Sequence, residues 1–225
     1  MEMLKLPLII LNFKTYEEAT GKGALRLSKI VEKISQKHKV DIVVVPQFYD
    51  VYLISKTTKV PVFTQHIDAI RPGAHTGHSL AKAARESGAI GTLINHSERR
   101  LPLKEIEKTV EIAKEVGLMT VVCVHNLSLA KKVLRFNPTF IAYEPPELIG
   151  TGKAVSKVKP KIVERFSRLV KNSGVIPLCG AGISDEKDVK KAIELGMSGV
   201  LLSSAFVKAR DPKSTLEKMA MALKF

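Results

Sequence analysis

The chain has 225 residues, 45% of them hydrophobic, and a formal net charge of +14 at neutral pH. This length fits one domain spanning residues 1–225. No apolar stretch approaches the roughly 20 residues needed to cross a bilayer, and the N-terminus does not resemble a signal peptide. We therefore expect a soluble, cytoplasmic protein without a membrane partner.

The positive charge allows three interpretations. A basic chain can bind nucleic acid, a surface rich in Lys and Glu is typical of heat-adapted proteins, and a positive field attracts an anionic, phosphorylated substrate. The lysines are spread over many helical segments, aromatic residues make up only 5%, and Trp is absent. We therefore expect no nucleic-acid partner.

Short apolar runs alternate with helix-like segments from one end of the chain to the other. The apolar runs are continuous, as in parallel strands that are buried on both faces. Eight β–α units in one chain predict an α/β fold, a closed (β/α)8 barrel. The expected strands are residues 8–13, 42–46, 60–64, 90–94, 119–124, 139–143, 175–179 and 200–202. The expected helices are residues 23–36, 51–54, 80–87, 102–116, 127–134, 159–172, 185–195 with Ser184 as N-cap, and 212 to the C-terminus.

Polar and small residues follow the expected strands, and in such a barrel the chemistry lies at the C-terminal strand ends. Together they supply a cation, a histidine, a carboxylate and two small-residue loops, and the last two loops are where such barrels commonly bind phosphate. These residues are Asn12, Lys14, Asn95-His96-Ser97-Glu98, Glu144, Gly180-Ala181-Gly182 and Ser203-Ser204.

Glu144 is followed by Pro145-Pro146 and by Gly150 and Gly152. Prolines stiffen the exit from a strand, and glycines allow a turn whose amides approach an anion. The pattern is typical of a catalytic base beneath a loop that closes over the substrate. The alternative is an ordinary β–α connection with an exposed Glu.

The cysteines and three of the histidines are interpreted as structural. Cys123 and Cys179 lie in apolar runs, where small buried residues are expected; they could form a disulfide, although isolated cysteines in a chain without a signal peptide more often stay reduced. His66, His75 and His78 lie in hydrophobic surroundings without a carboxylate at ligand spacing, so we expect no metal site.

Four motifs in separate β–α units resemble the triosephosphate isomerase family, in its archaeal form. They are Asn12-Phe13-Lys14, His96-Ser97-Glu98-Arg99-Arg100, Ala142-Tyr143-Glu144-Pro145 with Ile149-Gly150-Thr151-Gly152, and Gly73-Ala74-His75-Thr76-Gly77. The resemblance implies interconversion of dihydroxyacetone phosphate and D-glyceraldehyde 3-phosphate through an enediolate, in glycolysis and gluconeogenesis, without cofactor or metal.

The resemblance also implies roles for the strand-end residues. Glu144 would be the base, His96 a neutral imidazole facing a helix N-terminus, Lys14 the cation and Asn12 an orienting donor. Glu98 would pair with Lys14. Singly, Lys14 could be a solvated lysine, Asn12 a turn former and His96 a core histidine or helix cap. The substrate would also contact Phe13, Ile149, Gly150, Gly182, Ser203 and Ser204, the phosphate being held mainly by backbone amides.

The chain departs from the better-known family pattern around the expected mobile loop. Cys179 replaces a tyrosine that latches the closed loop, and Glu147 replaces a tryptophan. Ser203-Ser204 stand in place of two glycines, and Gly182 in place of a serine.

The loop with Thr76 inserts into a neighbouring subunit in the family. The resemblance therefore implies a dimer, and its archaeal form implies a homotetramer. Two other classes are alternatives. An epimerase or aldolase barrel would need a metal or a Schiff-base lysine, and a non-catalytic basic binding module would need no residues gathered at a barrel mouth.

Overall fold

The computed structural model describes residues 4–145 and 160–224. Within these residues, eight parallel strands form one sheet in the order β2-β1-β8-β7-β6-β5-β4-β3. The order follows the chain around a ring, as predicted for a (β/α)8 barrel. The strands are β1 (Leu8–Asn12), β2 (Ile42–Val45), β3 (Phe63–Thr64), β4 (Gly91–Ile94), β5 (Met119–Val124), β6 (Phe140–Tyr143), β7 (Ile176–Cys179) and β8 (Gly199–Leu202).

The ring closes between β2 and β3 through one bridge, from Val44 to Val62. The Val44 amide donates to the Pro61 carbonyl across this joint at 3.0 Å. The joint between β7 and β8 is also narrow, with a single paired position, Cys179 opposite Val200. By contrast, β1 and β2 pair over four positions.

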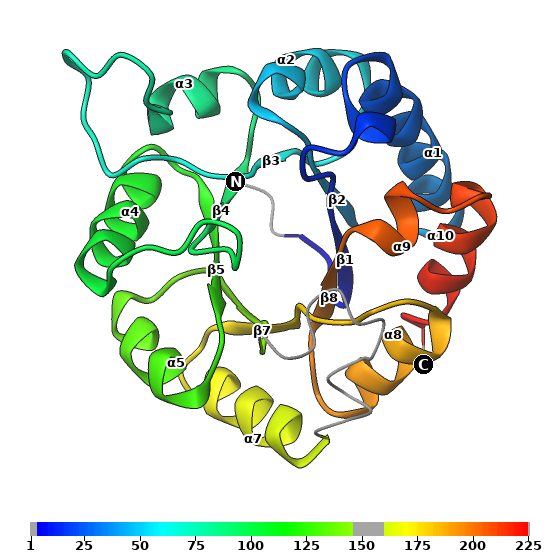
Figure 1. Cartoon of the computed structure of the whole chain (residues 1–225). Coiled ribbons are helices and arrows are strands. Elements are labelled where there is room, and N and C mark those ends of the chain that lie inside the picture. Colours follow the sequence, from blue (N-terminus) through cyan, green and yellow to red (C-terminus); the bar gives the residue numbers. More distant parts are fainter. Residues whose placement is uncertain (1–3, 146–159, 225) are drawn as a thin grey trace.

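Helices surround the barrel in Figure 1. Each has an apolar face at helical spacing; in α7, for example, Val163, Phe166, Ser167 and Val170 are buried. The helices are α1 (Lys22–His38), α2 (Phe48–Thr57), α3 (Ala81–Glu86), α4 (Leu103–Glu115), α5 (Leu127–Val133), α7 (Pro160–Lys171), α8 (Glu186–Glu194), α9 (Ser204–Val207) and α10 (Pro212–Met221), with 3-10 turns η1 (Glu17–Ala19) and η2 (Leu134–Phe136).

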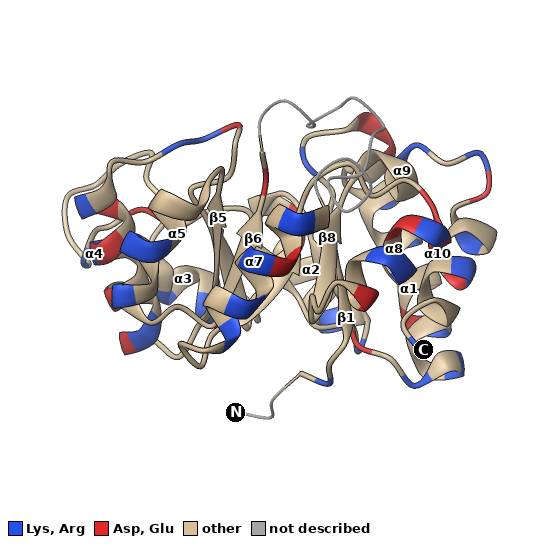
Figure 2. Ribbon diagram, turned by 90° about the horizontal axis from the view of Figure 1, so that it is seen from below, with Lys and Arg blue, Asp and Glu red and all other residues tan. Residues whose placement is uncertain are grey.

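Two hydrophobic cores result from the alternation of side chains along the strands. The inner core fills the barrel and includes Leu8, Ile10, Phe63 and Cys123. The outer core lies between strands and helices and includes Cys179. Both cysteines are buried, as expected. Charged residues lie mainly on the helices and loops in Figure 2. Among the described residues, no helix is long and apolar enough to span a bilayer.

The structure corrects several details of the predicted elements. Helix α2 is longer than the predicted 51–54, while β3 is shorter than 60–64 because Pro61 has no N–H for a ladder. The single turn α9 was not predicted, since four residues carry no periodicity.

The predicted N-cap Ser184 is wrong, because Asp185 caps α8. Its carboxylate accepts from the Asp188 amide at 2.8 Å. The Asp188 carboxylate in turn accepts from the Ser184 amide at 2.9 Å.

Candidate active site

A cavity of about 540 Å³ opens at the C-terminal ends of the strands. This volume is typical of a site for a small molecule. The cavity brings together eight residues predicted from the sequence: Asn12, Lys14, His96, Glu98, Glu144, Gly182, Ser203 and Ser204. Ile149, Gly150 and the rest of the expected mobile loop, including Glu147, lie outside the described residues.

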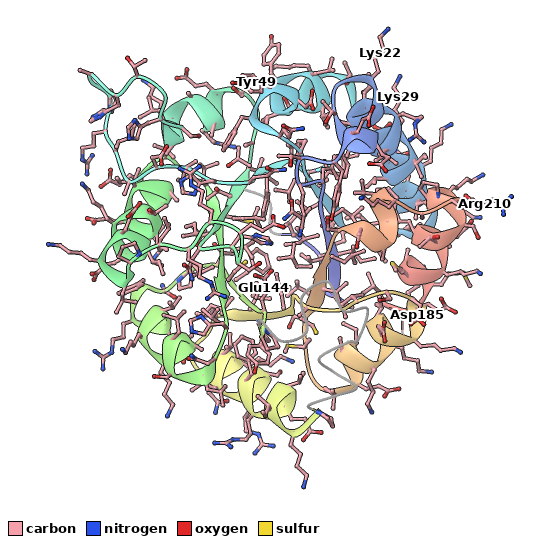
Figure 3. All side chains as sticks on the ribbon, viewed as in Figure 1. Lys22, Lys29, Tyr49, Glu144, Asp185 and Arg210 are labelled. Atoms are coloured by element: carbon pink, nitrogen blue, oxygen red, sulfur yellow. The ribbon has the colours of Figure 1, made fainter. Side chains whose placement is uncertain are left out.

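Glu144 lies near the centre of the ring of strands when the barrel is viewed along its axis (Figure 3). Its amide donates to the Val124 carbonyl at 2.8 Å, which fixes its backbone to the end of β5. The side chain is buried, and within the described residues its Oε2 has no hydrogen-bond partner. Burial raises the pKa of this carboxyl, while His96, the Cys123 thiol, the Ser97 amide and Lys14 act in the opposite direction.

His96 faces Glu144 across the cavity, with 3.7 Å between Nε2 and Oε1. Its Nδ1 accepts from the Glu98 amide at 3.2 Å. A nitrogen that accepts a hydrogen bond carries no proton, so this arrangement places the single ring proton on Nε2, directed into the cavity. The expectation of a helix N-terminus at this ring is wrong, because the donating amide belongs to a turn and α4 begins only at Leu103.

Lys14 also lines the cavity, and its backbone is left-handed, with φ of 49°. Its amide donates to Asn12 Oδ1 at 2.9 Å, and its Nζ pairs with Glu98 Oε1 at 2.6 Å. The ion pair expected between Lys14 and Glu98 is therefore confirmed as a contact. Gln65 donates to the Lys14 carbonyl at 2.7 Å.

Two expected residues lie away from the cavity. Phe13 is buried in the outer core, where its ring lies 6.4 Å from that of Phe206, centroid to centroid. Its expected substrate contact is wrong for this side chain, because the side chain packs in the outer core and does not line the cavity. Thr76 lies in a loop, residues 71–78, in which every residue is exposed.

The histidines of this loop region differ from their expected surroundings. His66 is buried and has a carboxylate partner after all, with Nε2 3.0 Å from Asp68 Oδ1. His75 and His78 are exposed to solvent and do not lie in the hydrophobic surroundings expected for them. In residues 4–145 and 160–224, His, Cys, Asp and Glu form no group of three that could hold a metal ion.

Sequence reasoning placed Gly180 at the barrel mouth in a run of small residues but gave it no role, and it missed Tyr16 and Gln65. Gly180 lies directly behind the base, since a Cβ added there would be 2.7 Å from Glu144 Cγ. Tyr16 lines the cavity, with Lys208 Nζ 4.3 Å from its ring centroid. Gln65 contacts Lys14. The first was visible only as part of a small-residue run, and the other two carried no signal in spacing.

The fold and the cavity define the class of protein: a (β/α)8-barrel enzyme with its small-molecule site at the C-terminal mouth. A sequence model described as triosephosphate isomerase matches residues 7–222. The triosephosphate isomerase of Methanocaldococcus jannaschii is 48% identical, covering 94% of this chain and 98% of that protein. The triosephosphate isomerase of Methanothermus fervidus is 47% identical, covering 95% of this chain and 97% of that protein. The chain belongs to the triosephosphate isomerase family.

Proposed function

We propose that this cavity interconverts dihydroxyacetone phosphate and D-glyceraldehyde 3-phosphate by proton transfer through an enediolate. The family makes the protein an isomerase. The observation that supports the assignment of residues is the buried Glu144 carboxylate facing a His96 ring nitrogen at 3.7 Å. These two groups are the pair that an enediolate mechanism needs: a base for carbon and a donor for oxygen.

In this mechanism the Glu144 carboxylate removes a proton from the carbon next to the carbonyl. The electron pair of that C–H bond forms the enediolate double bond, and negative charge moves onto the carbonyl oxygen. His96 stabilises this oxygen through its Nε2–H, and the Lys14 ammonium adds positive charge. A proton then passes from the neighbouring hydroxyl oxygen to the former carbonyl oxygen, so that the first oxygen becomes the new carbonyl oxygen. Glu144 returns the proton that it removed to the adjacent carbon, which takes up the electron pair of the enediolate double bond.

We assign phosphate binding to the loops after β7 and β8. Gly182, Ser203 and Ser204 line the cavity on this side, where small residues let backbone amides approach an anion. The Ser203 hydroxyl is buried, and among the described residues it has no hydrogen-bond partner. This unsatisfied group supports a ligand at this side. Ile149 and Gly150 would contribute from the loop outside the described residues.

The test is isomerase activity in the wild type and in Glu144→Gln. Removing a general base lowers kcat by about 10²- to 10⁴-fold, so we expect a loss of that size. Glu86→Gln, the same change at an exposed site on α3, serves as control and should retain wild-type activity. An inactive wild type would overturn the function, and an active Glu144→Gln variant would remove the role of Glu144.

The family is oligomeric, and we further propose a homotetramer in the cytoplasm, with residues 1–225 forming one domain. Residues 71–78 are exposed along their whole length, and the chain forms a projecting loop here in Figure 1. Helix α2 adds an exposed apolar surface with Phe48, Tyr52 and Tyr49, the last 94% exposed. Both features support burial against other subunits.

Light scattering tests this assembly. We expect a mass four times the 24.7 kDa of the chain. Thr76→Arg should dissociate the assembly through the exposed loop, whereas Lys82→Arg on exposed α3 should not. A wild-type mass of two chains would contradict the tetramer, and a monomer would contradict both assemblies.

A further inference from the structure

We propose that Asn95 is a positioning residue for His96: its buried side chain holds the loop that carries the histidine against the end of β5. The inference rests on the role of His96 under the proposed function. It concerns the residue immediately before the histidine, at the point where β4 ends and the loop to α4 begins.

The backbone of Asn95 is left-handed, with φ of 60°. Most residues avoid this region because Cβ crowds the carbonyl oxygen, whereas Asn tolerates it better and Gly adopts it freely. The left-handed residue turns the chain sharply out of β4. The direction of the His96 side chain therefore depends on the conformation of its predecessor.

Both polar ends of the Asn95 side chain are hydrogen-bonded. Nδ2 donates to the Cys123 carbonyl on β5 at 2.8 Å, and Oδ1 accepts from the Leu101 amide at 2.8 Å. The residue is only 5% exposed. One side chain thus joins the start of the loop, its far end and the neighbouring strand.

These bonds link the two groups that face each other across the cavity. Cys123 pairs with Ala142 on β6, two residues before Glu144. The Asn95 bond to Cys123 therefore ties the His96 loop to the strand pair that carries the base. This bond is the direct link from the Asn95 side chain to β5, so its loss would loosen the His96 loop and the distance of 3.7 Å between His96 Nε2 and Glu144 Oε1.

The sharpest variant is Asn95→Gly, because glycine keeps the left-handed backbone and removes only the two side-chain bonds. Asn137→Gly is the matched control: Asn137 is also left-handed, with φ of 50°, but it is exposed and follows η2. His96→Gln provides the reference for complete loss of the imidazole.

We expect kcat of Asn95→Gly to fall about 10- to 100-fold, because displacement by about 1 Å costs rates of this order. KM and inhibition by inorganic phosphate should change less than about twofold, since the β7 and β8 loops are untouched. The His96 Nε2 resonance in the nitrogen NMR spectrum should shift in Asn95→Gly and not in Asn137→Gly.

An Asn95→Gly variant with wild-type kcat and an unshifted His96 resonance would overturn the inference, as would equal losses of kcat in both glycine variants. If only thermal stability falls, Asn95 is structural and the inference is also overturned. If His96→Gln is fully active, the proposed role of His96 fails first, which separates the two claims. Should the glycine variant not fold, Asn95→Asp carries the same kcat measurement, because Asp tolerates the left-handed backbone and keeps the acceptor for Leu101.

Discussion

Burial of Glu144 has opposite effects on catalysis and on stability. The raised pKa makes the carboxylate a stronger base, but it also means that ionising the group in the folded protein costs free energy. The folded state holds this proton more tightly than the unfolded state. Stability therefore falls as the pH rises from the ordinary Glu value, about 4.3, through the raised pKa.

Two pH effects follow for Glu144. We expect the acid limb of kcat/KM to lie above the ordinary Glu pKa, because the base must be ionised.

We also expect Glu144→Gln to melt at a higher temperature than wild type at pH 7, with the difference shrinking towards pH 4, where both side chains are neutral. Thermal unfolding at both pH values measures this. A Gln variant less stable at pH 7 than at pH 4, relative to wild type, would contradict the sign.

Gly180 is expected to be required for the position of Glu144. Gly180→Ala would put a methyl group 2.7 Å from Glu144 Cγ, closer than carbon atoms approach, so the carboxylate must move. We predict a fall in kcat of about 10- to 100-fold, following the cost of small misplacements. Gly117→Ala is the control for general destabilisation: an added Cβ there meets nothing within 4 Å, but the positive φ of 74° strains the backbone outside the cavity lining. Equal activity of Gly180→Ala and wild type would show that the carboxylate position is not decisive.

For single residues, the sequence indicates which ones reach the barrel mouth but not the direction in which each side chain points. Asn12, Lys14, His96 and Glu144 follow strands, and parallel strand ends meet by geometry. Phe13 follows a strand equally well and points outward. Gln65 and Gly180 act through contacts between units distant in sequence, which no local pattern encodes.

At the level of elements, the N-cap of α8 can be tested separately from the active site. Asp185→Ala removes the carboxylate that accepts from the Asp188 amide, so we expect a loss of about 1 kcal/mol in the free energy of unfolding. Asp185→Asn keeps a capping oxygen and should stay close to wild type. Urea unfolding of the three proteins measures the difference. Equal losses in both variants would point to the charge of Asp185 instead of its cap.

Strands were the most predictable elements because short, continuous apolar runs are typical of parallel strands buried on both faces. Strand β5 matches its predicted residues 119–124. Helix α2 was underestimated because four of its residues are exposed apolar side chains, which interrupt the expected polar face: Phe48, Tyr49, Tyr52 and Leu53. Hydrophobic periodicity alone does not reveal that these apolar side chains lie on the surface.

For the whole molecule, the closed barrel was predictable from repetition, but its uneven closure was not. Among the described strands, the joints β2–β3 and β7–β8 each have a single bridging pair. Pro61 and Pro177 lie at these joints, and neither can donate a ladder hydrogen bond. The two joints divide the barrel into an arc of β8, β1 and β2 and an arc of β3 to β7.

The active site draws on both arcs. Lys14 follows β1 and Ser203 follows β8, whereas His96 and Glu144 follow β4 and β6. Proteins open locally at their weakest joints, and amide hydrogen exchange reports such openings. The Val44 and Ser198 amides, which bond across the joints to Pro61 and Pro177, should exchange before those within β5. An anion held between the arcs would oppose their separation, so saturating phosphate should slow exchange at both joints together, although neither amide touches the ligand.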